Sequence, residues 1–382
     1  MIYRQLGKTG IEVGAISLGC EGFAGKTHAE AKKMMDFAIE NGINFIDIYA
    51  SDPELRSAIG HAIAGRFDRF HVQGHVGSVW KNGQYERTRN VAESRAAFDD
   101  LLTRLGTDHV DVGMIHYCDQ MADFHAIFDT PFIDFVQELK AAGKIRAVGI
   151  SSHNPIVAKM AAETGLIDVL MFSANPCYDM QPPGEDVEKL WADEVYEKQY
   201  HNFNSEREEL YTICERLGIG IDVMKVYAGG DLLKADQSMF GKAMTPVQAL
   251  HYALTRPAVA AVMVGCRSIA EIEAALAWCF ASEADKDYST VLAGLEKCSW
   301  SGHCMYCGHC APCPKAISVA EVNKFLNLAL AQGSVPETVR EHYKLLEHHA
   351  SECIQCGACE KRCPFGVPVR EKMKLAAKTF GE

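Results

Sequence analysis

Eight of the fifteen cysteines are gathered in two short runs near the end of the chain. The runs are Cys304, Cys307, Cys310 and Cys313, followed by Pro314, and Cys353, Cys356, Cys359 and Cys363, followed by Pro364. Clustered thiolates bind soft metals, either in iron–sulfur clusters or in tetrahedral zinc sites. Zinc sites usually take two cysteines from each of two separated loops, whereas each run here offers four closely spaced thiolates and ends in Cys-Pro. The spacing therefore favours iron–sulfur clusters over zinc, and disulfides are the least favoured alternative.

The two runs resemble the cysteine pattern of bacterial ferredoxins, in which the fourth cysteine of each run binds the cluster held by the other run. The resemblance implies two 4Fe-4S clusters. It assigns Cys304, Cys307, Cys310 and Cys363 to one cluster, and Cys353, Cys356, Cys359 and Cys313 to the other. Cys298 and His303 lie close to the first run, and we expect both to be bystanders.

The overall composition limits the classes of function. The chain has 382 residues, of which 48% are hydrophobic, and this is enough for one large domain and one small domain. A formal net charge of -12 argues against nucleic-acid binding, which depends on lysines and arginines that neutralise phosphates. The sequence shows neither an apolar run of membrane-spanning length nor a signal-peptide pattern. We therefore expect a cytoplasmic protein with no membrane partner.

Short apolar runs alternate with amphipathic helical stretches from residue 15 onward. We expect strands at 15–19, 44–49, 70–76, 110–116, 145–151, 169–174, 220–226 and 260–265, after a hairpin at 3–14. We expect helices between them, among others at 29–40, 92–105, 132–142, 206–217 and 269–279. Eight alternations in this length predict a (β/α)8 barrel rather than an open doubly wound sheet, since no Gly-x-Gly-x-x-Gly follows the first strand.

The pattern also suggests how the chain is divided. We assign residues 1–290 to the barrel and residues 291–382 to a small ferredoxin-like domain. The segment 178–205 is long for a loop between a strand and a helix, and we expect either a lid or a surface insertion without a role. Residues 318–332 predict a helix that packs on the barrel or on a second subunit.

Several sequences at the strand ends resemble those of the aldo/keto reductase family. They are Asn44-Phe-Ile-Asp47, Ile115-His116, Gly149-Ile-Ser151, Val223-Met-Lys225 and Val264-Gly265 before an Arg-Ser turn. With the cysteine runs, the chain resembles the subgroup that carries a C-terminal ferredoxin-like domain. The resemblance implies that NADPH lies across the carboxyl ends of the strands. It also implies an Asp, Tyr, Lys and His tetrad that protonates a carbonyl oxygen as hydride arrives.

Only half of this tetrad is present. Asp47 and His116 match the family's aspartate and histidine, whereas the lysine position holds His75 and the tyrosine position holds Asp52. Tyr49 lies two residues after Asp47, so strand periodicity turns both side chains to the same side. We expect Asp47, Tyr49, His75 and His116 to converge at the top of the barrel as catalytic residues, because a histidine can exchange protons near neutral pH. The alternative for Tyr49 and His75 is a packed, hydrogen-bonded role.

The positions that the resemblance assigns to NADPH are altered too. The serine–asparagine pair that holds the nicotinamide reads Ser151-Ser152, and the pair that grips adenine reads Ala274-Ala275. A phosphate site at a helix N-terminus remains a candidate, with an ordinary helix cap as its alternative. The candidate cofactor contacts are Ser151, Ser152, Asn175, Lys225, Arg267 and Ser268. NADP(H) binding is therefore doubtful from the sequence.

Three functions follow from these features. The first is an oxidoreductase whose barrel holds a small carbonyl or hydroxyl substrate and whose clusters pass electrons to or from an external redox carrier. The second is NADPH-dependent carbonyl reduction with auxiliary clusters. The third is a non-catalytic electron-transfer or redox-responsive protein.

Overall fold

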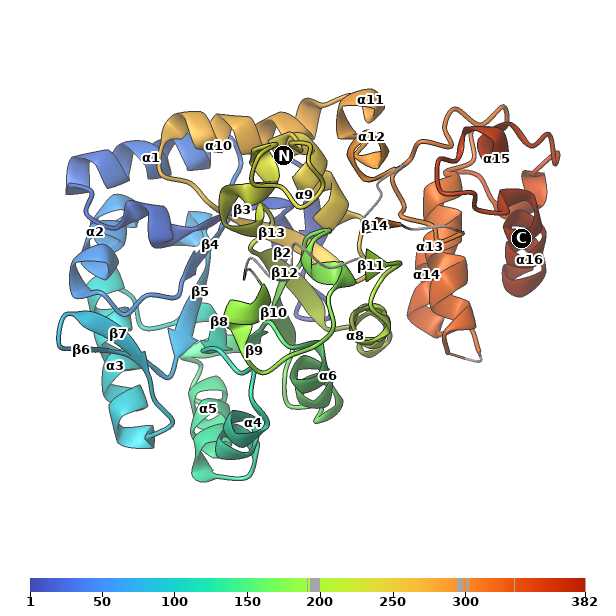
Figure 1. Cartoon of the computed structure of the whole chain (residues 1–382). Coiled ribbons are helices and arrows are strands. Elements are labelled where there is room, and N and C mark those ends of the chain that lie inside the picture. Colours follow the sequence, from blue (N-terminus) through green and yellow to red (C-terminus); the bar gives the residue numbers. More distant parts are fainter. Residues whose placement is uncertain (191, 193–199, 294–297, 300–301, 333, 382) are drawn as a thin grey trace.

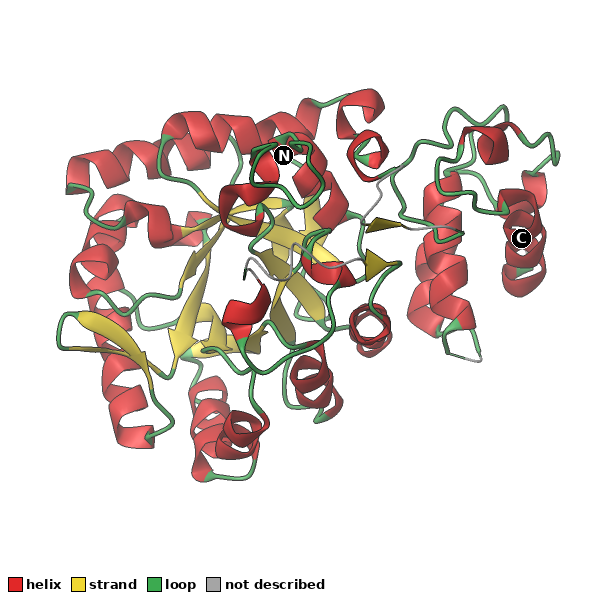
Figure 2. Ribbon diagram, in the orientation of Figure 1, coloured by secondary structure: helices red, strands yellow, loops and turns green. Residues whose placement is uncertain are grey.

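The computed structural model describes residues 1–381 except 191, 193–199, 294–297, 300–301 and 333 (Figure 1). A closed barrel of eight parallel strands, surrounded by helices, makes up the larger part (Figure 2). A smaller part, built from helices and the loops that carry both cysteine runs, lies beside the barrel (Figure 1). Both the barrel and the separate cysteine-rich part confirm the predicted fold class.

The barrel strands are paired in the order β3, β4, β5, β8, β9, β10, β12 and β13, and β13 closes onto β3. Their bounds are β3 (Ile16–Gly19), β4 (Phe45–Ile48), β5 (His71–Val76), β8 (Val110–Ile115), β9 (Ile145–Ser152), β10 (Val169–Ser173), β12 (Gly220–Met224) and β13 (Val259–Gly265). Almost every strand residue is buried, as expected for parallel strands covered by helices on the outside. The eight predicted strands therefore agree with the structure to within a few residues.

The helices around the barrel bury one face each. In α1 (His28–Glu40), the buried residues Ala31, Met34, Met35 and Ala38 form an apolar stripe, and Thr27 caps the N-terminus in a capping box with Glu30. The other α-helices of the barrel are α2 (Pro53–Ile63), α3 (Val91–Leu105), α4 (Met121–Phe128), α5 (Pro131–Ala141), α6 (Pro155–Glu163), α8 (Ser205–Leu217), α9 (Pro246–Leu254), α10 (Ile269–Leu276), α11 (Glu283–Lys286) and α12 (Ser289–Leu292). Within the described residues, no helix is both long enough and apolar enough to span a bilayer.

The cysteine-rich part contains α13 (Val319–Leu330), α14 (Glu337–Lys344), α15 (Ala358–Arg362) and α16 (Val369–Phe380). Helix α13 confirms the predicted helix between the two cysteine runs, and it packs against α14 and α16. Short 3-10 helices complete the chain: η1 (Cys20–Phe23), η2 (Phe67–Arg69), η3 (Tyr178–Met180), η4 (Val187–Leu190), η5 (Ala228–Leu233), η6 (Ala277–Phe280) and η7 (Ala350–Glu352).

Two hairpins extend the barrel at opposite ends. The predicted N-terminal hairpin pairs β1 (Tyr3–Gln5) with β2 (Glu12–Gly14), and its apolar side chains pack with residues at the beginnings of the barrel strands. A second hairpin, β6 (Ser78–Lys81) with β7 (Gln84–Arg87), follows β5 at the carboxyl end of the strands. The sequence analysis missed this second hairpin, although its turn contains Asn82-Gly83, a common hairpin signal.

The long segment at 178–205 is tied to the start of the cysteine-rich part. Within it, β11 (Tyr200–His201) pairs in parallel with β14 (Cys298–Ser299). Residues 191 and 193–199 lie outside the described part of the chain, so a lid at this segment stays a prediction. The proposed domain boundary near residue 290 falls in α12 and also stays a prediction.

Gly22 allows the turn after β3 to approach the loop after β13. A Cβ atom at Gly22 would lie 2.1 Å from the carbonyl oxygen of Cys266, which is fixed backbone. We expect Gly22→Ala to lower the free energy of unfolding by about 1–3 kcal/mol, as overpacking does elsewhere. Gly184→Ala is the matched control, because a Cβ there meets nothing within 4 Å. Urea unfolding followed by circular dichroism measures both variants, and equal stability of the two would contradict the close approach.

Candidate functional site

Three side chains from neighbouring strands form a hydrogen-bond chain at the carboxyl end of the barrel, here called the mouth. Asp47 lies on β4, His75 on β5 and His116 directly after β8, and these strands are adjacent. His75 Nε2 lies 3.0 Å from Asp47 Oδ1, and His75 Nδ1 lies 2.7 Å from His116 Nδ1. The three residues are only 2%, 2% and 6% exposed. His75 thus contacts Asp47 at the position that the family resemblance gives to lysine.

These contacts restrict where protons sit. A carboxylate only accepts hydrogen bonds, so His75 carries a proton on Nε2 toward Asp47. The two Nδ1 atoms share a single proton, because one nitrogen must donate while the other accepts. When His75 is positively charged and donates at both nitrogens, His116 carries its own proton on Nε2. His116 is then able to give this proton to an oxygen in the mouth and to regain one from His75.

The surroundings keep His116 neutral. Burial holds the pKa of His116 well below 6.5, and positive charge on His75, Arg89 and Arg87 lowers it further. Arg89 also fixes the backbone here, since it donates to the carbonyl oxygen of His116 at 2.7 Å and pairs with Asp123 at 2.7 Å. His116 is therefore held as a neutral hydrogen-bond donor rather than as a cation.

Gln73 connects this chain to the centre of the barrel. Its Nε2 donates to Asp47 Oδ1 at 2.9 Å and to Asp222 Oδ2 at 3.0 Å. Burial and the negative charge of Asp47 raise the pKa of Asp222 to about 8. At neutral pH Asp222 is therefore mostly protonated. Gln73 lies two residues before His75 on β5, so strand periodicity alone indicates that both point inward.

Two tyrosines line the mouth beside the histidines. The Tyr49 ring lies parallel to the His116 ring, with centroids 6.2 Å apart, and Tyr85 lies 5.7 Å from the His116 ring. Burial and then the Glu21 carboxylate raise the pKa of Tyr49, so its phenol is a weak acid. The structure places Tyr49 in the site, while its catalytic role stays a prediction. Tyr85 comes from the second hairpin, which the sequence analysis did not identify.

Asp52, at the position of the family's tyrosine, has a structural task. It is the N-cap of α2, and its carboxylate accepts a hydrogen bond from the Glu54 backbone N–H at 2.8 Å.

The residues predicted to hold the nicotinamide contact other parts of the chain. The Ser151 hydroxyl accepts a hydrogen bond from the Tyr117 backbone at 2.8 Å, and the Ser152 hydroxyl donates to Asp119 at 2.9 Å. The side chain of Asn175 donates to the carbonyl oxygen of Lys225 at 2.9 Å. These groups are therefore engaged by the protein itself.

The predicted phosphate site carries carboxylates instead. Ser268 caps α10, and the carboxylate of Glu271 accepts a hydrogen bond from the backbone N–H of Arg267 at 2.6 Å. The carboxylate of Glu21 also lies beside the end of β13. A Cβ atom placed on Gly265, the last residue of β13, would be 2.6 Å from the Glu21 carboxylate. Negative charge at a helix N-terminus opposes a phosphate there. The arrangement fits a dinucleotide poorly. The side chains of Lys225 and Arg267 are exposed at the same end of the barrel.

The two cysteine runs share one backbone conformation. Tyr306 and Gly308 flank Cys307 with φ values of 59° and 80°, and Gln355 and Gly357 flank the matching cysteine of the second run with 57° and 73°. A left-handed φ is costly for Tyr306 and Gln355, by about 1–3 kcal/mol each. The same costly turn at equivalent places indicates that both loops wrap similar groups.

The two cysteine runs lie close enough to influence each other. Burial is the main cause of the raised pKa of Cys304 and Cys310; Cys363 also raises the pKa of Cys304, and Cys304, Cys359 and Cys363 raise that of Cys310. The division of the eight cysteines into two sets stays a prediction. Arg362 joins the runs by donating to the carbonyl oxygen of Cys310 at 2.6 Å. The eight individual ligands stay predictions.

A single zinc ion and a 4Fe-4S cluster require different arrangements of the cysteines. A zinc site gathers four donors about 2.1–2.3 Å from one ion. Among the residues that the structure describes, no three His, Cys, Asp or Glu side chains converge in that way. In a 4Fe-4S cluster each iron takes its own cysteine, so the four sulfurs surround the cluster rather than a single point. His303 is stacked on Phe203 with ring centroids 5.7 Å apart, as expected of a bystander, and the side chain of Cys298 lies outside the described residues.

The ligand assignment is testable at Cys356. We expect Cys356→Ala to lose about half of the iron and sulfide, because one cluster loses an anchor, and to destabilise the cysteine-rich part. Iron and sulfide analysis of anaerobically purified protein measures this, and Cys279→Ala outside both runs is the control. Full iron content in the Cys356 variant would contradict the assignment.

The lowered pKa of His116 predicts a pH effect on stability. The unfolded chain binds a proton at this residue near pH 6.5, whereas the folded chain binds it only at lower pH. Stability is therefore lost as the pH falls below 6.5, by at most about 1.4 kcal/mol per pH unit for this group. Thermal unfolding between pH 7 and pH 5 should show a shallower loss for His116→Asn than for the wild type. Parallel profiles would show that His116 titrates normally.

Comparison with known proteins places the chain in a family. Residues 11–246 match the Aldo/keto reductase family, and residues 300–367 match the 4Fe-4S dicluster domain. Aldo-keto reductase YhdN of Bacillus subtilis is 25% identical over 334 residues, which cover 76% of this chain and 94% of that protein. The 6-dehydroglucose reductase of Novosphingobium aromaticivorans is 29% identical over 162 residues, which cover 39% of this chain and 51% of that protein.

The fold has close counterparts among solved structures. The holo form of aldo-keto reductase AKR11C1 from Bacillus halodurans superposes with a TM-score of 0.59 at 24% identity, covering 75% of this chain and 94% of that chain. At this identity the likeness supports the fold alone. The family match covers more than half of the chain, and the dicluster match covers both cysteine runs. The chain is therefore an oxidoreductase of the aldo/keto reductase family that carries a C-terminal 4Fe-4S dicluster domain.

Proposed function

We propose that this protein interconverts a small carbonyl compound and its alcohol at the barrel mouth, with electrons passing through its two clusters to or from an external redox carrier. The observation that carries the proposal is the chain of Asp47, His75 and His116 in a mouth whose nucleotide contacts are engaged or acidic. The mouth thus has groups that can exchange a proton with a substrate. The residues that would bind a hydride-donating nucleotide, by contrast, are engaged by the protein or lie beside carboxylates.

The residues of the mouth handle the proton at the substrate oxygen. Reduction of a carbonyl to a hydroxyl takes two electrons and two protons; the residues of the mouth supply the proton that goes to oxygen, and solvent water supplies the one that goes to carbon. His116 gives its Nε2 proton to the oxygen while the Nδ1 proton of His75 moves to His116. Asp47 stabilises the charged form of His75 before this transfer. Bound 4Fe-4S clusters carry single electrons, so two clusters match the two electrons of the reaction.

The mouth and the first cysteine run are connected through buried contacts. Tyr117 follows His116, and its ring lies 6.4 Å from the His116 ring and 5.6 Å from that of His153. The carbonyl oxygen of His153 accepts a hydrogen bond from Arg207, which lies on α8 and is 1% exposed. These contacts reach from the mouth into the layer between the barrel and its helices.

The second half of the connection crosses to the cysteine run. Asp179 pairs with Arg207 at 3.3 Å and accepts a hydrogen bond from Tyr252 at 2.8 Å. The rings of Tyr252 and Tyr288 lie 5.3 Å apart, and Tyr288 donates to the carbonyl oxygen of Met305 at 2.5 Å. Met305 lies between the first two cysteines of the run. The run itself lies beside α9 and the start of β13, at the other end of the strands from the mouth, so the proposal requires electrons to pass along this chain of contacts.

The substrate class also has support from one relative. The reductase of Novosphingobium aromaticivorans acts, by its name, on 6-dehydroglucose, a sugar with an additional carbonyl group. We infer a carbonyl or hydroxyl compound for this chain and leave its identity to a screen.

The proposed function is testable with a panel of carbonyl compounds. In protein with chemically reduced clusters, we expect a substrate to reoxidise the clusters, followed by their visible absorption under anaerobic conditions. His116→Ala should slow this by about 100-fold or more, the usual contribution of a proton donor. His109→Ala is the control, because His109 is exposed and paired with Asp108 away from the mouth.

Ordinary NADPH-dependent carbonyl reduction is the competing function, favoured by family membership and by Asp47 and His116. Calorimetry with NADPH distinguishes the two, and we expect no binding heat. Rapid NADPH oxidation that persists after the clusters have been removed would reject electron passage through the clusters. Unchanged reoxidation in His116→Ala would instead point to a non-catalytic carrier.

A further inference from the structure

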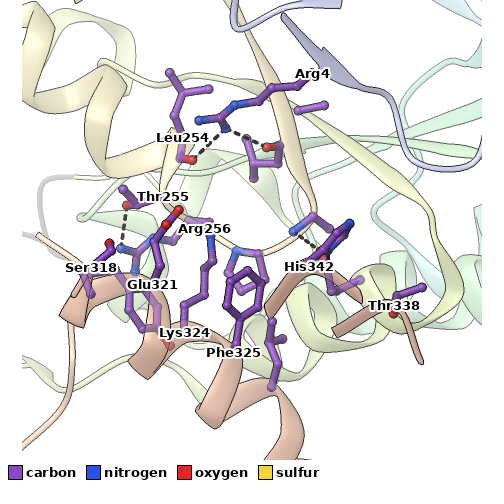
Figure 3. A pocket seen from close by; sticks show the side chains of 18 of the residues that line it. Arg4, Leu254, Thr255, Arg256, Ser318, Glu321, Lys324, Phe325, Thr338 and His342 are labelled. Carbon is purple, nitrogen blue, oxygen red and sulfur yellow. Dashed lines mark hydrogen bonds and ion pairs between the residues drawn. The ribbon is translucent and has the colours of Figure 1, made fainter. Parts of the chain in front are cut away.

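A large cavity lies between the two parts of the chain, away from the mouth. Its volume is about 860 Å³, within the range of small-molecule sites. One wall comes from the end of the barrel where the strands begin, and the other from the cysteine-rich part, chiefly α13 and α14. Figure 3 shows Arg4 on the barrel side, and Lys324 and Phe325 on the side of α13.

The cavity wall holds positive charges that no carboxylate neutralises. Arg4 donates only to the carbonyl oxygens of Leu254 and Val259, at 2.9 and 3.1 Å. Arg256 donates to carbonyl and hydroxyl oxygens, among them that of Tyr288 at 3.1 Å. In the described part of the chain, neither arginine forms an ion pair with a carboxylate. Three aromatic rings surround Arg256, and although burial lowers its pKa, Tyr288, Tyr252 and Asp179 together raise it above the usual value, so the protein itself stabilises this charge.

Lys324 is a third cation at the cavity wall. Its Nζ lies 5.1 Å from the ring of Phe325, and the described residues offer it no carboxylate within ion-pair distance. Burial lowers the pKa of Lys324, and burial likewise lowers that of Arg4. Both residues are half-buried, and an anion bound in the cavity would offset the cost of removing their charges from water.

The carboxylates near the cavity do not serve this purpose. Glu215 is paired with His342 at 2.9 Å and accepts a hydrogen bond from the backbone N–H of Ala258 at 2.9 Å. Glu321 influences both Arg4 and Lys324, but it is exposed at the rim and bonds to neither. Glu283 and Glu341 also line the cavity, so its walls carry charges of both signs, and Arg4 and Lys324 are among the cations that form no ion pair within the described residues.

The remaining wall suits an apolar body. Phe325, Leu328, Ile317 and Trp278 line the cavity together with the chain around Pro257. Such a combination, an apolar wall with a few convergent charged groups, is typical of sites for small organic ligands.

We propose that this cavity binds a small organic anion, with a carboxylate or phosphate head at Arg4 and Lys324 and an apolar or aromatic body against Phe325 and Leu328. Part of the wall is Tyr306, Gly308 and Cys310 of the first cysteine run. The ligand therefore touches the loop of one cluster, and its negative charge disfavours the reduced, more negative state of that cluster. The site is independent of the chemistry at the barrel mouth.

The binding test uses the anaerobically purified holoprotein and isothermal calorimetry. Naphthyl phosphate and naphthoate carry the two alternative heads, naphthalenemethanol is their neutral analogue, and inorganic phosphate is the head alone. We expect the anionic probes to bind more tightly than naphthalenemethanol. The stronger of the two identifies the head that the cavity prefers. Equal affinity for the neutral and anionic probes, or binding of none of them, would reject the site.

Two variants test the residues. Lys324→Met removes the positive charge but keeps an apolar side chain in the wall. It should weaken binding of the preferred anion about tenfold or more. Glu321→Gln removes negative charge from the rim and should strengthen binding of the same anion. A general disturbance of the fold would instead change the affinity of both variants in the same direction. Lys374→Met, on an exposed part of α16, should leave the affinity unchanged. Unaltered affinity in Lys324→Met would contradict the assignment.

A redox titration followed by electron paramagnetic resonance tests the contact with the cluster. Saturating naphthyl phosphate or naphthoate, whichever binds, should lower the reduction potential of one cluster and leave the other unchanged, so the second cluster is an internal control. In Lys324→Met the same concentration should cause a smaller shift. Equal shifts of both clusters, or no shift at saturation, would contradict ligand contact with the first cysteine run.

Discussion

The hydrogen bond between Asp47 and His75 is the interaction on which the barrel mouth depends. Both groups are buried, and a buried imidazolium is stable only beside a counter-charge. The family resemblance places a lysine here, whose ammonium stays charged at neutral pH. His75 instead faces a second imidazole at 2.7 Å. The substitution therefore places a ring with two nitrogens between Asp47 and His116, and the proposed proton transfer rests on this arrangement.

A second buried charge holds the structure together between the barrel and the cysteine-rich part. Asp179 is fully buried and contacts Arg207 and the hydroxyls of Tyr211 and Tyr252. Its burial raises its pKa despite these partners, so the network is satisfied but costly. The network around Asp179 holds α9 in place. Arg256 follows the end of α9 and donates a hydrogen bond to the carbonyl oxygen of Met305 in the first cysteine run. The loop is thus attached by directed hydrogen bonds, which set its position more narrowly than apolar packing alone.

Much of this architecture follows from local sequence patterns, and the exceptions have physical reasons. The barrel strands were predictable because buried parallel strands are short apolar runs, and the meeting of Asp47, His75 and His116 follows from strand ends at one edge of a barrel. Tyr85 was not predictable, because its place depends on how a hairpin of ten residues folds over the mouth. The cavity wall was equally hidden, because Arg4 and Lys324 are over 300 residues apart and meet only through the packing of α13.

The distribution of charge links these features. At the mouth, the carboxylates of Glu21 and Glu271 lie beside the end of β13 and the start of α10, where negative charge opposes a phosphate. At the opposite end of the strands, Arg4 and Lys324 face a cavity without a carboxylate partner in the described chain. The proposed anion site therefore lies at the other end of the strands from the mouth. Because its wall includes Cys310, an anion bound there would lie beside the first cysteine run rather than beside the histidines of the mouth.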